Sequence, residues 1–401
     1  MEILMRQLFL KKREDRRIRA GHLWVFSNEV DVARTPLTAF EPGEPVTLCD
    51  ASGTPLGAGY VNPSSLIAAR LLTRTPGEAP GTDLIRRRLT DALALRERLF
   101  DAPCYRLCHS EGDFLPGLVV DRFGDTLSVQ LNTAGMERLR LSVLEVLCNL
   151  LHPTTIVLRN DTASRALEGL PRETETVLGT LPDEVELVEN GVTFRAPMAP
   201  TQGGQKTGWF YDQRFNRLEA ARHAGPRVLD AFCYAGGFGV MAVRGGAREV
   251  TFLDASAAAL DAAAANLRRT APDAGVECLH GDALTLLAEL RDAGRRFDLV
   301  CLDPPAFIKR RKDAAQGLAA YRRVNDLGLQ LVADGGTLIT CSCSHHLETD
   351  ALQHLLTQSL ARRGLFGQLL RKGYQGPDHP VHPAMPETAY LKALTVRVRR
   401  D

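Results

Sequence analysis

From about residue 226 onward, the chain alternates strictly between apolar, strand-like runs and helical segments. We expect the strands at about residues 227–232, 249–254, 276–280, 297–303 and 336–342, and the helices from about 238, 257–269, 283–293 and 314–332. Apolar runs of this length between helices are typical of a buried parallel sheet with helices on both faces. The pattern therefore predicts a doubly wound α/β domain in the second half of the chain.

The first half of the chain has a different pattern. Residues 1–76 contain short strand-like runs between glycine and proline turns, which indicates a small β-barrel-like module. Residues 77–190 mix helices and strands, with a helical stretch over about 82–100 and a hairpin signal at 122–125. A length of 401 residues fits two or three domains. We therefore predict three domains: 1–76, a central α+β domain at 77–190, and 191–401.

Charge and cysteine content limit the classes of protein to consider. A balance of 49 Lys+Arg against 48 Asp+Glu excludes binding of nucleic acid by bulk charge alone, although a local basic face remains open. The sequence has no apolar run of about 18 residues and no secretory signal pattern, so we expect no membrane span. Nine scattered cysteines, an odd number, indicate reduced thiols in a cytoplasmic protein.

The first strand of the α/β half leads into a glycine-rich loop that contains Gly236, Gly237 and Gly239. Glycines allow a tight turn and a close approach of the backbone to a ligand. Their spacing does not match the Gly-x-Gly-x-x-Gly of a dinucleotide site, and Asp230 would repel a pyrophosphate. A carboxylate there attracts a cation such as S-adenosylmethionine, which carries a sulfonium and an α-ammonium group. The alternative is a glycine-rich turn that binds no ligand.

Further carboxylates follow the neighbouring strands. Asp254 ends the second strand at a distance suited to a ribose diol. Asp282 follows the third strand and could accept the adenine amino group, cap the helix that begins at Ala283, or do both. The candidate cofactor residues of these loops are Asp230, Phe232, Tyr234, Gly236, Gly237, Asp254, Ser256, Asp282, Asp303 and Pro304.

Asp303 opens an Asp-Pro-Pro turn after the fourth strand. Two prolines stiffen this turn, which can hold a planar base, and the motif is a strong methyltransferase signal. Cys343 follows the fifth strand, so we expect it at the same rim as Asp303. Addition of its thiolate to C6 of a pyrimidine would make C5 able to attack a methyl group, a form of covalent catalysis.

Other roles for the cysteines of this segment stay open. A small buried hydrophobic residue is the alternative for Cys343 and the better explanation of Cys341. A bound sulfonium, His345 or His346 could favour the thiolate of Cys343. A zinc site is disfavoured because these cysteines and histidines are spaced too closely for the usual ligand patterns.

Two basic runs are candidates for contact with nucleic acid. Each run alone fits a solvated surface, but positive charge at a helix start is unfavourable with the helix dipole, which favours phosphate contact for the second run. The candidate residues are Lys11, Lys12, Arg13 and Arg17 near the start of the chain and Lys309, Arg310, Arg311 and Lys312 after the proline turn.

Six motifs together resemble the ribosomal large-subunit methyltransferase I family, over essentially the whole chain. They are Arg-Ala-Gly-His-Leu-Trp-Val-Phe-Ser at 19–27, the segment 112–124, the segment 206–214, Ser-Cys-Ser at 342–344, Asp-His-Pro at 378–380 and Tyr-Leu-Lys at 390–392. The resemblance implies an N-terminal RNA-binding PUA domain that includes Trp24, and a C-terminal Rossmann-like class I methyltransferase domain. It also implies cofactor contacts for Lys206, Thr207, Gly208, Asp212 and Gln213, and the role of nucleophile for Cys343.

The same resemblance implies an activity, the formation of 5-methylcytosine in 23S ribosomal RNA with S-adenosylhomocysteine as the second product. Many cytosine-C5 RNA methyltransferases carry a second cysteine in the motif that here reads Pro304-Pro305-Ala306, so a one-cysteine mechanism is implied. The substrate would be 23S RNA or a large-subunit assembly intermediate, and the family suggests a homodimer. Two alternatives stay open: methylation of an exocyclic amine or guanine ring nitrogen without a cysteine, and a non-catalytic RNA-binding assembly factor.

Overall fold

The computed structural model of the chain describes residues 5–198 and 208–400, which form two compact units. The first unit comprises Met1–Val185, Met198–Trp209 and Pro377–Thr388, and the second comprises Glu186–Pro197, Phe210–Gly376 and Ala389–Asp401. The predicted division into three domains at residues 76 and 190 stays a prediction. Within the two described ranges, no helix has the length and apolar character needed to cross a bilayer.

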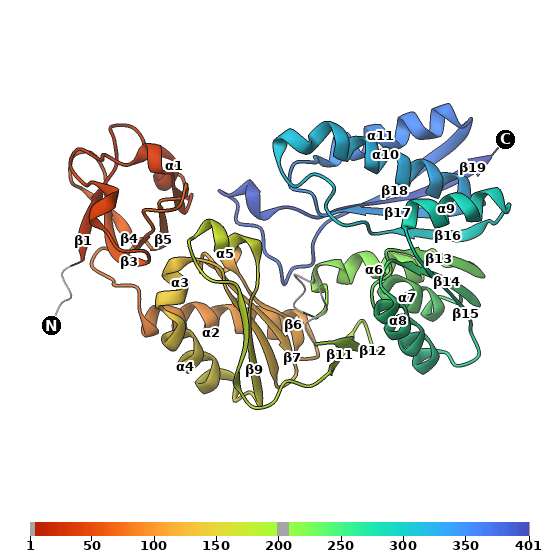
Figure 1. Cartoon of the computed structure of the whole chain (residues 1–401), viewed down its shortest axis with the longest axis horizontal. Coiled ribbons are helices and arrows are strands. Elements are labelled where there is room, and N and C mark those ends of the chain that lie inside the picture. Colours follow the sequence, from red (N-terminus) through yellow and green to blue (C-terminus); the bar gives the residue numbers. More distant parts are fainter. Residues whose placement is uncertain (1–4, 199–207, 401) are drawn as a thin grey trace. The chain divides into compact units, whose positions relative to one another are not determined.

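The start of the first unit is a small sheet, drawn in red to orange in Figure 1. Its described strands lie in the order β1-β3-β4-β5-β2. They are β1 (Arg6–Phe9), β2 (Trp24–Val25), β3 (Glu44–Cys49), β4 (Pro55–Val61) and β5 (Ala69–Thr73), with the short helix α1 (Arg16–Arg19). Val46 and Leu48 alternate along β3 and are buried in one cluster with Leu8 and Leu71. The prediction of short strands between turns is confirmed.

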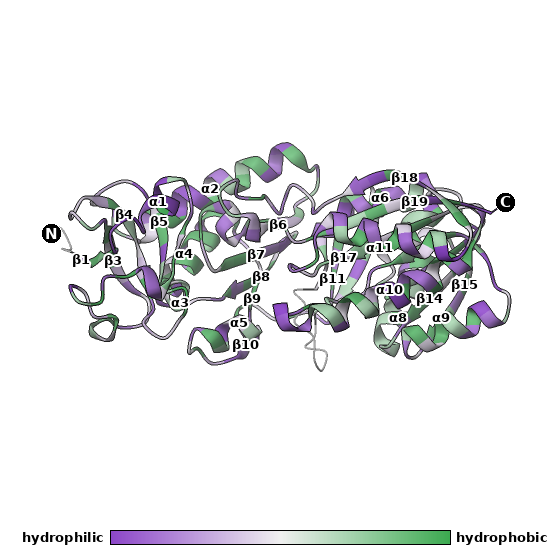
Figure 2. Ribbon diagram, turned by 90° about the horizontal axis from the view of Figure 1, so that it is seen from above, coloured by the Kyte–Doolittle hydropathy of each residue, from purple (hydrophilic) through white to green (hydrophobic). Residues whose placement is uncertain are grey.

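The remainder of the first unit is a second sheet with helices. Its described strands lie in the order β10-β9-β8-β7-β6. The elements are α2 (Thr82–Leu99), β6 (Cys104–His109), β7 (Leu118–Phe123), β8 (Thr126–Leu131), α3 (Ala134–Arg138), α4 (Arg140–Leu151), β9 (Thr155–Asn160), α5 (Ala163–Leu167) and β10 (Glu173–Leu178). Phe123 pairs with Thr126, which confirms the predicted hairpin. Hydrophobic and hydrophilic residues alternate along α2 (Figure 2), which buries Leu84, Ile85 and Leu89.

The second unit contains the predicted α/β alternation, drawn in green to blue in Figure 1. Its described elements are α6 (Arg214–Arg222), β13 (Arg227–Ala231), α7 (Gly237–Arg244), β14 (Glu249–Asp254), α8 (Ala257–Thr270), β15 (Gly275–His280), α9 (Ala283–Asp292), β16 (Phe297–Leu302), α10 (Ala314–Leu331), β17 (Val332–Ser342), α11 (Thr349–Arg362), β18 (Leu365–Gly373) and β19 (Lys392–Arg400). A hairpin of β11 (Glu184–Glu189) and β12 (Val192–Pro197) precedes them along the chain.

The main sheet of the second unit has the described strand order β15-β14-β13-β16-β17-β19-β18. The strands from β13 to β17 pair in parallel, whereas β19 pairs antiparallel with both β17 and β18. The sequence analysis predicted the five parallel strands but not β18 and β19. The residues of β18 are mostly exposed, so this strand lacks the apolar pattern that marks a buried strand.

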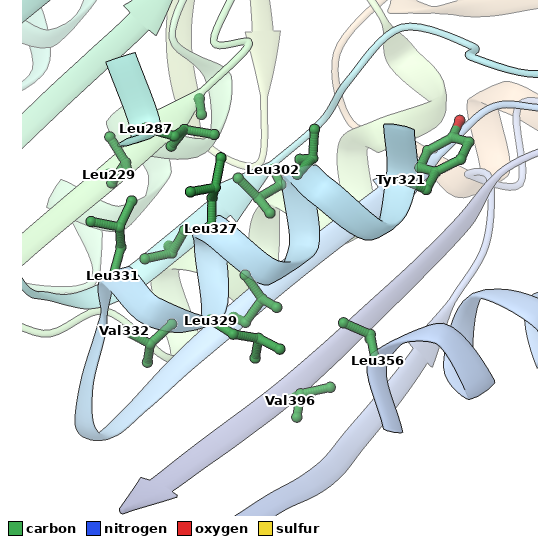
Figure 3. Packing of buried hydrophobic residues seen from close by; sticks show 14 of the residues in the cluster. Leu229, Leu287, Leu302, Tyr321, Leu327, Leu329, Leu331, Val332, Leu356 and Val396 are labelled. Atoms are coloured by element: carbon green, nitrogen blue, oxygen red, sulfur yellow. The ribbon is translucent and has the colours of Figure 1, made fainter. Parts of the chain in front are cut away.

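The core of the second unit lies between the sheet and its helices. Figure 3 shows α10 with buried leucines on more than one side: Leu327 lies near Leu302, and Leu329 lies on the side of Val396. Because this helix packs against both β16 and β17, its apolar surface is wide. The core therefore fixes the strands whose ends carry the candidate site.

The register of the parallel strands brings the predicted loops to one rim. Ala231 pairs with both Leu253 and Leu302, and Leu302 pairs with Thr340. The residues that follow these pairs are the glycine-rich loop, Asp254, Asp303 and the Ser-Cys-Ser segment. Carboxyl ends of parallel strands at a point where the strand order reverses are the usual place for a ligand in an open α/β sheet.

Candidate active site

Asp230 lies beneath the loop that joins β13 to α7. Its side chain is almost fully buried, and its Oδ2 accepts a hydrogen bond from the backbone N–H of Gly239 at 2.8 Å. Its Oδ1 is buried and has no hydrogen-bond partner among the described residues. Burial raises the pKa of Asp230 to about 8, and the negative charges of Asp303 and Asp254 contribute to the shift. A cation bound near this carboxyl group would stabilise its ionised form and so oppose the effects of burial, Asp303 and Asp254 on its pKa.

The same loop is strained. Phe232 has φ of 60° and Tyr234 has φ of 49°, although neither is glycine. Such left-handed residues cost of order 1–3 kcal/mol each and gather at functional sites, where surrounding contacts hold them in place. One such contact is present here, since the N–H of Tyr234 donates to Asp254 Oδ2 at 3.0 Å. This contact helps to hold the loop in a defined shape.

Gly236 has φ of 79°, which fits the predicted tight turn, and two glycines of the loop have a packing role in addition to the predicted one. A Cβ at Gly237 would lie 2.5 Å from Arg217 Nε, and a Cβ at Gly239 would lie 2.4 Å from a ring carbon of Phe252. Close packing of α7 therefore excludes side chains at both positions, whether or not a ligand is near. Arg217 itself is buried and forms an ion pair with Glu189 at 2.7 Å. Sequence reasoning missed this pair because neither residue lies in a recognisable motif.

Asp254, Ser256 and Asp282 organise the next two loops. Asp254 Oδ1 accepts from the N–H of Ser256 at 3.0 Å, and the Ser256 hydroxyl caps α8. Asp282 is exposed and caps α9, and its Oδ1 accepts from the N–H and the hydroxyl of Thr285, both at 2.9 Å. These bonds lower the pKa of Asp282. The capping role that we weighed for Asp282 is present, and its predicted contact with adenine stays a prediction.

The segment that precedes α6 lies beside the proline turn. Gln213 donates from Nε2 to Asp303 Oδ1 at 2.9 Å. Asp212 Oδ2 accepts from the Tyr390 hydroxyl at 2.8 Å. The structure therefore brings Asp212 and Gln213, which only the family resemblance suggested, into the same site as Asp303. Lys206 and Thr207 lie outside the described residues, and Gly208 belongs to the first compact unit.

Cys343 lies half-buried directly after β17. Burial raises the pKa of its thiol to about 12, and Asp303 and Asp212 lie close enough to add to this rise, whereas Lys392 lowers it. The segment around Cys343 is held firmly, because the Ser344 hydroxyl accepts from the Ile308 N–H at 3.1 Å and contacts the Tyr321 hydroxyl at 2.8 Å. The thiol is therefore fixed at the rim but protonated at neutral pH.

Sequence reasoning also missed Lys392. Its Nζ donates to the backbone oxygens of Ser344 at 2.7 Å and Tyr390 at 2.9 Å, and burial lowers its pKa. A bound sulfonium, His345 or His346 as the charge that favours the Cys343 thiolate stays a prediction. His345 packs its ring against Tyr390, with ring centroids 5.6 Å apart. The motif Tyr-Leu-Lys at 390–392 was the available signal, but nothing in it indicated contact with the cysteine segment.

Two more residues of this rim, Cys341 and Pro304, are buried. Cys341 is fully buried within β17, and its thiol lies 3.8 Å from Gln213 Oε1. Pro304 is buried as well. A buried position for Cys341 agrees with its predicted role as a small hydrophobic residue.

The two predicted basic runs differ in how many of their side chains bond to other residues of the chain. In the second unit Lys309, Arg311 and Lys312 are exposed, and Arg310 pairs with Asp313 at 3.1 Å. In the first unit Lys12 and Arg13 are exposed, whereas Lys11 Nζ donates to Asn28 O at 2.8 Å. Arg17 pairs with Glu29 at 2.7 Å, and Trp24 Nε1 donates to Glu111 at 2.8 Å. The polar atoms of these last two side chains thus already stabilise the fold.

The residues of the rim fit the predicted cofactor. S-adenosylmethionine is a cation, and Asp230 presents a buried carboxyl oxygen without a hydrogen-bond partner among the described residues. Asp254 and Asp303 add negative charge near it. The set contains hydroxyl-binding and cation-binding groups and lacks the glycine pattern of a pyrophosphate site.

Comparisons with known proteins agree with this description. A family model described as a PUA-like domain matches residues 8–74, and one described as an S-adenosylmethionine-dependent methyltransferase matches residues 157–397. A protein from Streptococcus mutans described as a SAM-dependent methyltransferase has a TM-score of 0.80 at 17% identity, covering 98% of this chain and 100% of that one. A methyltransferase solved with SAH has a TM-score of 0.82 at 18% identity over the same shares. These likenesses confirm the predicted fold.

Curated relatives are similar over nearly the full length. The ribosomal RNA large subunit methyltransferase I of Klebsiella pneumoniae (strain 342) is 36% identical over 401 residues, which covers 98% of this chain and 99% of the relative. The protein of the same name from Tolumonas auensis is 36% identical over 397 residues, covering 97% and 98%. The chain therefore belongs to the ribosomal RNA large subunit methyltransferase I family of S-adenosylmethionine-dependent methyltransferases.

Proposed function

We propose that this chain methylates C5 of a cytosine in 23S ribosomal RNA, free or within a large-subunit assembly intermediate. The observation that carries the proposal is the position of Cys343 beside Asp303 and Asp212, at the rim where the cofactor carboxylates gather. The names of the relatives support a large-subunit RNA as the substrate. The predicted cytoplasmic location and the homodimer belong to the same proposal.

In this proposal Asp230 faces the positive charge of the cofactor, Asp254 holds its ribose and Asp282 its adenine. When bound, S-adenosylmethionine supplies the methyl group together with a positive charge. Asp303, held by Gln213, contacts the cytosine at its polar edge, and the stiff proline turn keeps the base in position. The exposed basic residues Lys12, Arg13, Lys309, Arg311 and Lys312 contact phosphates without reading sequence.

Cys343 acts as the nucleophile. Its thiol gives its proton to a base, and Sγ forms a bond to C6 of the cytosine while the C5=C6 double bond shifts its electron pair to C5. C5 would then form a bond to the methyl carbon that bound S-adenosylmethionine would supply, and the bond from that carbon to sulfur would break to give a neutral thioether. A base removes the proton from C5, the C5=C6 bond forms again, and the Sγ–C6 bond breaks to return the thiolate. The atoms and charges balance over this sequence.

The pKa of Cys343, raised to about 12, favours one alternative as the second candidate function. A thiol that stays protonated fits methylation of an exocyclic amine or guanine ring nitrogen, for which no thiolate is needed. The two functions differ in the nucleoside they produce.

Methyl transfer from labelled S-adenosylmethionine to unmodified 23S RNA, followed by nucleoside mass spectrometry, tests the proposal. We expect 5-methylcytosine as the labelled nucleoside. A labelled N-methylated nucleoside would replace the proposal with the second candidate. Absence of both methyl transfer and cofactor binding would leave a non-catalytic RNA-binding factor.

The raised pKa of Asp230 predicts that cofactor affinity depends on pH. Between about pH 5.5 and 7.5 the free chain holds Asp230 largely protonated, and binding of a cation requires its ionised form. Affinity should therefore rise with pH, by up to about tenfold per unit, and level off near pH 8. Calorimetry with S-adenosylmethionine across this range is the measurement. Asp230→Asn should bind more weakly and lose the slope, and an equal slope in both proteins would contradict this role.

A further inference from the structure

The first unit contains a pocket that the proposed chemistry does not use. Its volume is about 590 Å³, and strand β5, helix α2, Phe114 and His382 line it. Three of its lining side chains are arginines, Arg74, Arg87 and Arg88, against one carboxylate, Glu78. Arg87 pairs with Glu78 at 2.7 Å, so the carboxylate is already neutralised. The pocket therefore carries excess positive charge.

Phe114 presents an aromatic ring at this pocket at a cost to the backbone. It follows a short 3₁₀ turn (Ser110–Asp113) with φ of 57°, a left-handed conformation that glycine adopts more easily. A buried ring would offset this strain by packing, yet Phe114 is 41% exposed. The backbone conformation at position 114 does not favour an aromatic residue, and packing buries only part of the Phe114 ring.

Arg88 extends over this ring. The centre of its guanidinium lies 4.9 Å from the centroid of the Phe114 ring. Its Nε is buried and has no hydrogen-bond partner among the described residues, and burial together with Arg87 lowers its pKa. His382 packs edge-on against the same ring, with centroids 5.2 Å apart. Burial and Arg74 lower the pKa of His382, so this imidazole is neutral at pH 7. The pocket thus joins a partly exposed aromatic ring to two arginines, Arg74 and Arg88, that form no ion pair among the described residues, although Asp91 and Glu78 lie near enough to act on Arg88.

We infer that this pocket binds one unstacked nucleotide of the RNA, with the base against Phe114 and its phosphate near Arg88 and Arg74. An aromatic ring offers a stacking surface to any base, and arginines supply bidentate contacts to phosphate. Binding a nucleotide would bury the exposed ring and compensate the excess charge at once. The inference rests on the proposed RNA substrate and adds a contact in the first unit to it.

Binding of a fluorescein-labelled single-stranded RNA, measured by anisotropy at several salt concentrations, tests the inference. Phe114→Gly is the informative variant, since glycine suits the left-handed backbone and the fold should be retained or slightly stabilised. We expect it to bind about tenfold more weakly, whereas Phe114→Tyr should stay within about twofold of the original protein. Arg88→Gln should weaken binding and lower the salt slope by about one.

Leu66→Ala is the matched control, because Leu66 is a hydrophobic side chain of the same unit that is 80% exposed and does not line the pocket. Equal RNA affinity of Phe114→Gly and the unchanged protein would overturn the inference that this pocket binds a nucleotide. The methyl-transfer assay on 23S RNA separates the two proposals. An unchanged protein that neither methylates nor binds RNA would refute the proposed function, whereas methylation without an effect of Phe114 would refute only the nucleotide pocket.

Discussion

We expect Cys343→Ala to lower methyl transfer to 23S RNA by at least about 10³-fold while binding of S-adenosylmethionine persists. Loss of a nucleophile that forms the covalent bond commonly removes this much of the rate or more. Alanine removes only the thiol from a half-buried position, so the fold should survive. Single-turnover transfer of label to RNA gives the rate, and calorimetry gives the affinity for the cofactor.

Cys341→Ala is the matched control for this experiment. Cys341 lies two residues earlier and is fully buried in β17. Removing its thiol should lower the free energy of unfolding by about 1 kcal/mol and leave the rate of methyl transfer nearly unchanged at a temperature where the variant is folded. If Cys343→Ala kept full activity, the covalent mechanism would be wrong, and mass spectrometry should then find the methyl group on a nitrogen atom.

Lys392→Met should lower methyl transfer at neutral pH by about 10- to 100-fold. The ammonium of Lys392 lowers the pKa of Cys343, and loss of a nearby opposite charge shifts a pKa by about one to two units, each worth tenfold in thiolate. Without the ammonium group, the pKa of the Cys343 thiol should rise further, and less thiolate should be present at neutral pH. Because the thiol is almost fully protonated in both proteins near neutral pH, the loss should be constant there. It should shrink at higher pH, where the Lys392 ammonium, whose pKa is lowered by burial, loses its own proton in the unchanged protein.

Lys372→Met is the control for this second prediction. Lys372 lies in β18 of the same unit, and its ammonium group pairs with the exposed Asp350 at 3.2 Å. It should leave the pH–rate profile unchanged. A loss in Lys392→Met that persists undiminished above the pKa of the Lys392 ammonium would show that the lysine only supports the backbone of Ser344 and Tyr390.

The rim of the α/β sheet could be predicted from sequence because its signals are local. Asp230 and Asp254 lie at the ends of apolar strands and Asp303 directly follows one, and parallel strands bring such ends together. Contacts between distant residues carry no such signal. Tyr390 reaches Asp212, and Lys392 reaches Ser344, only because β19 pairs beside β17, and no local pattern specifies that pairing.

The structural role of a residue was also harder to predict than its place in the fold. The glycines after Asp230 were predicted to allow a tight turn and a close approach to a ligand, and packing adds a second reason for two of them, because Gly237 and Gly239 make room for Arg217 and Phe252. Whether a glycine faces a ligand or a neighbouring side chain depends on how α7 packs, which is a property of the whole unit. The strain at Phe232 and Tyr234 is likewise visible only in the backbone angles.

The position of β19 has a consequence for how the protein is made. This strand lies between β17 and β18, so the sheet beside Cys343 is complete only when Lys392 has paired with Ser342. During synthesis, residues 343–391 emerge before the strand that secures them, and Lys392 cannot reach Ser344 until they have left the ribosome. The sheet beside Cys343 can therefore close only after residues 392–400 have been made.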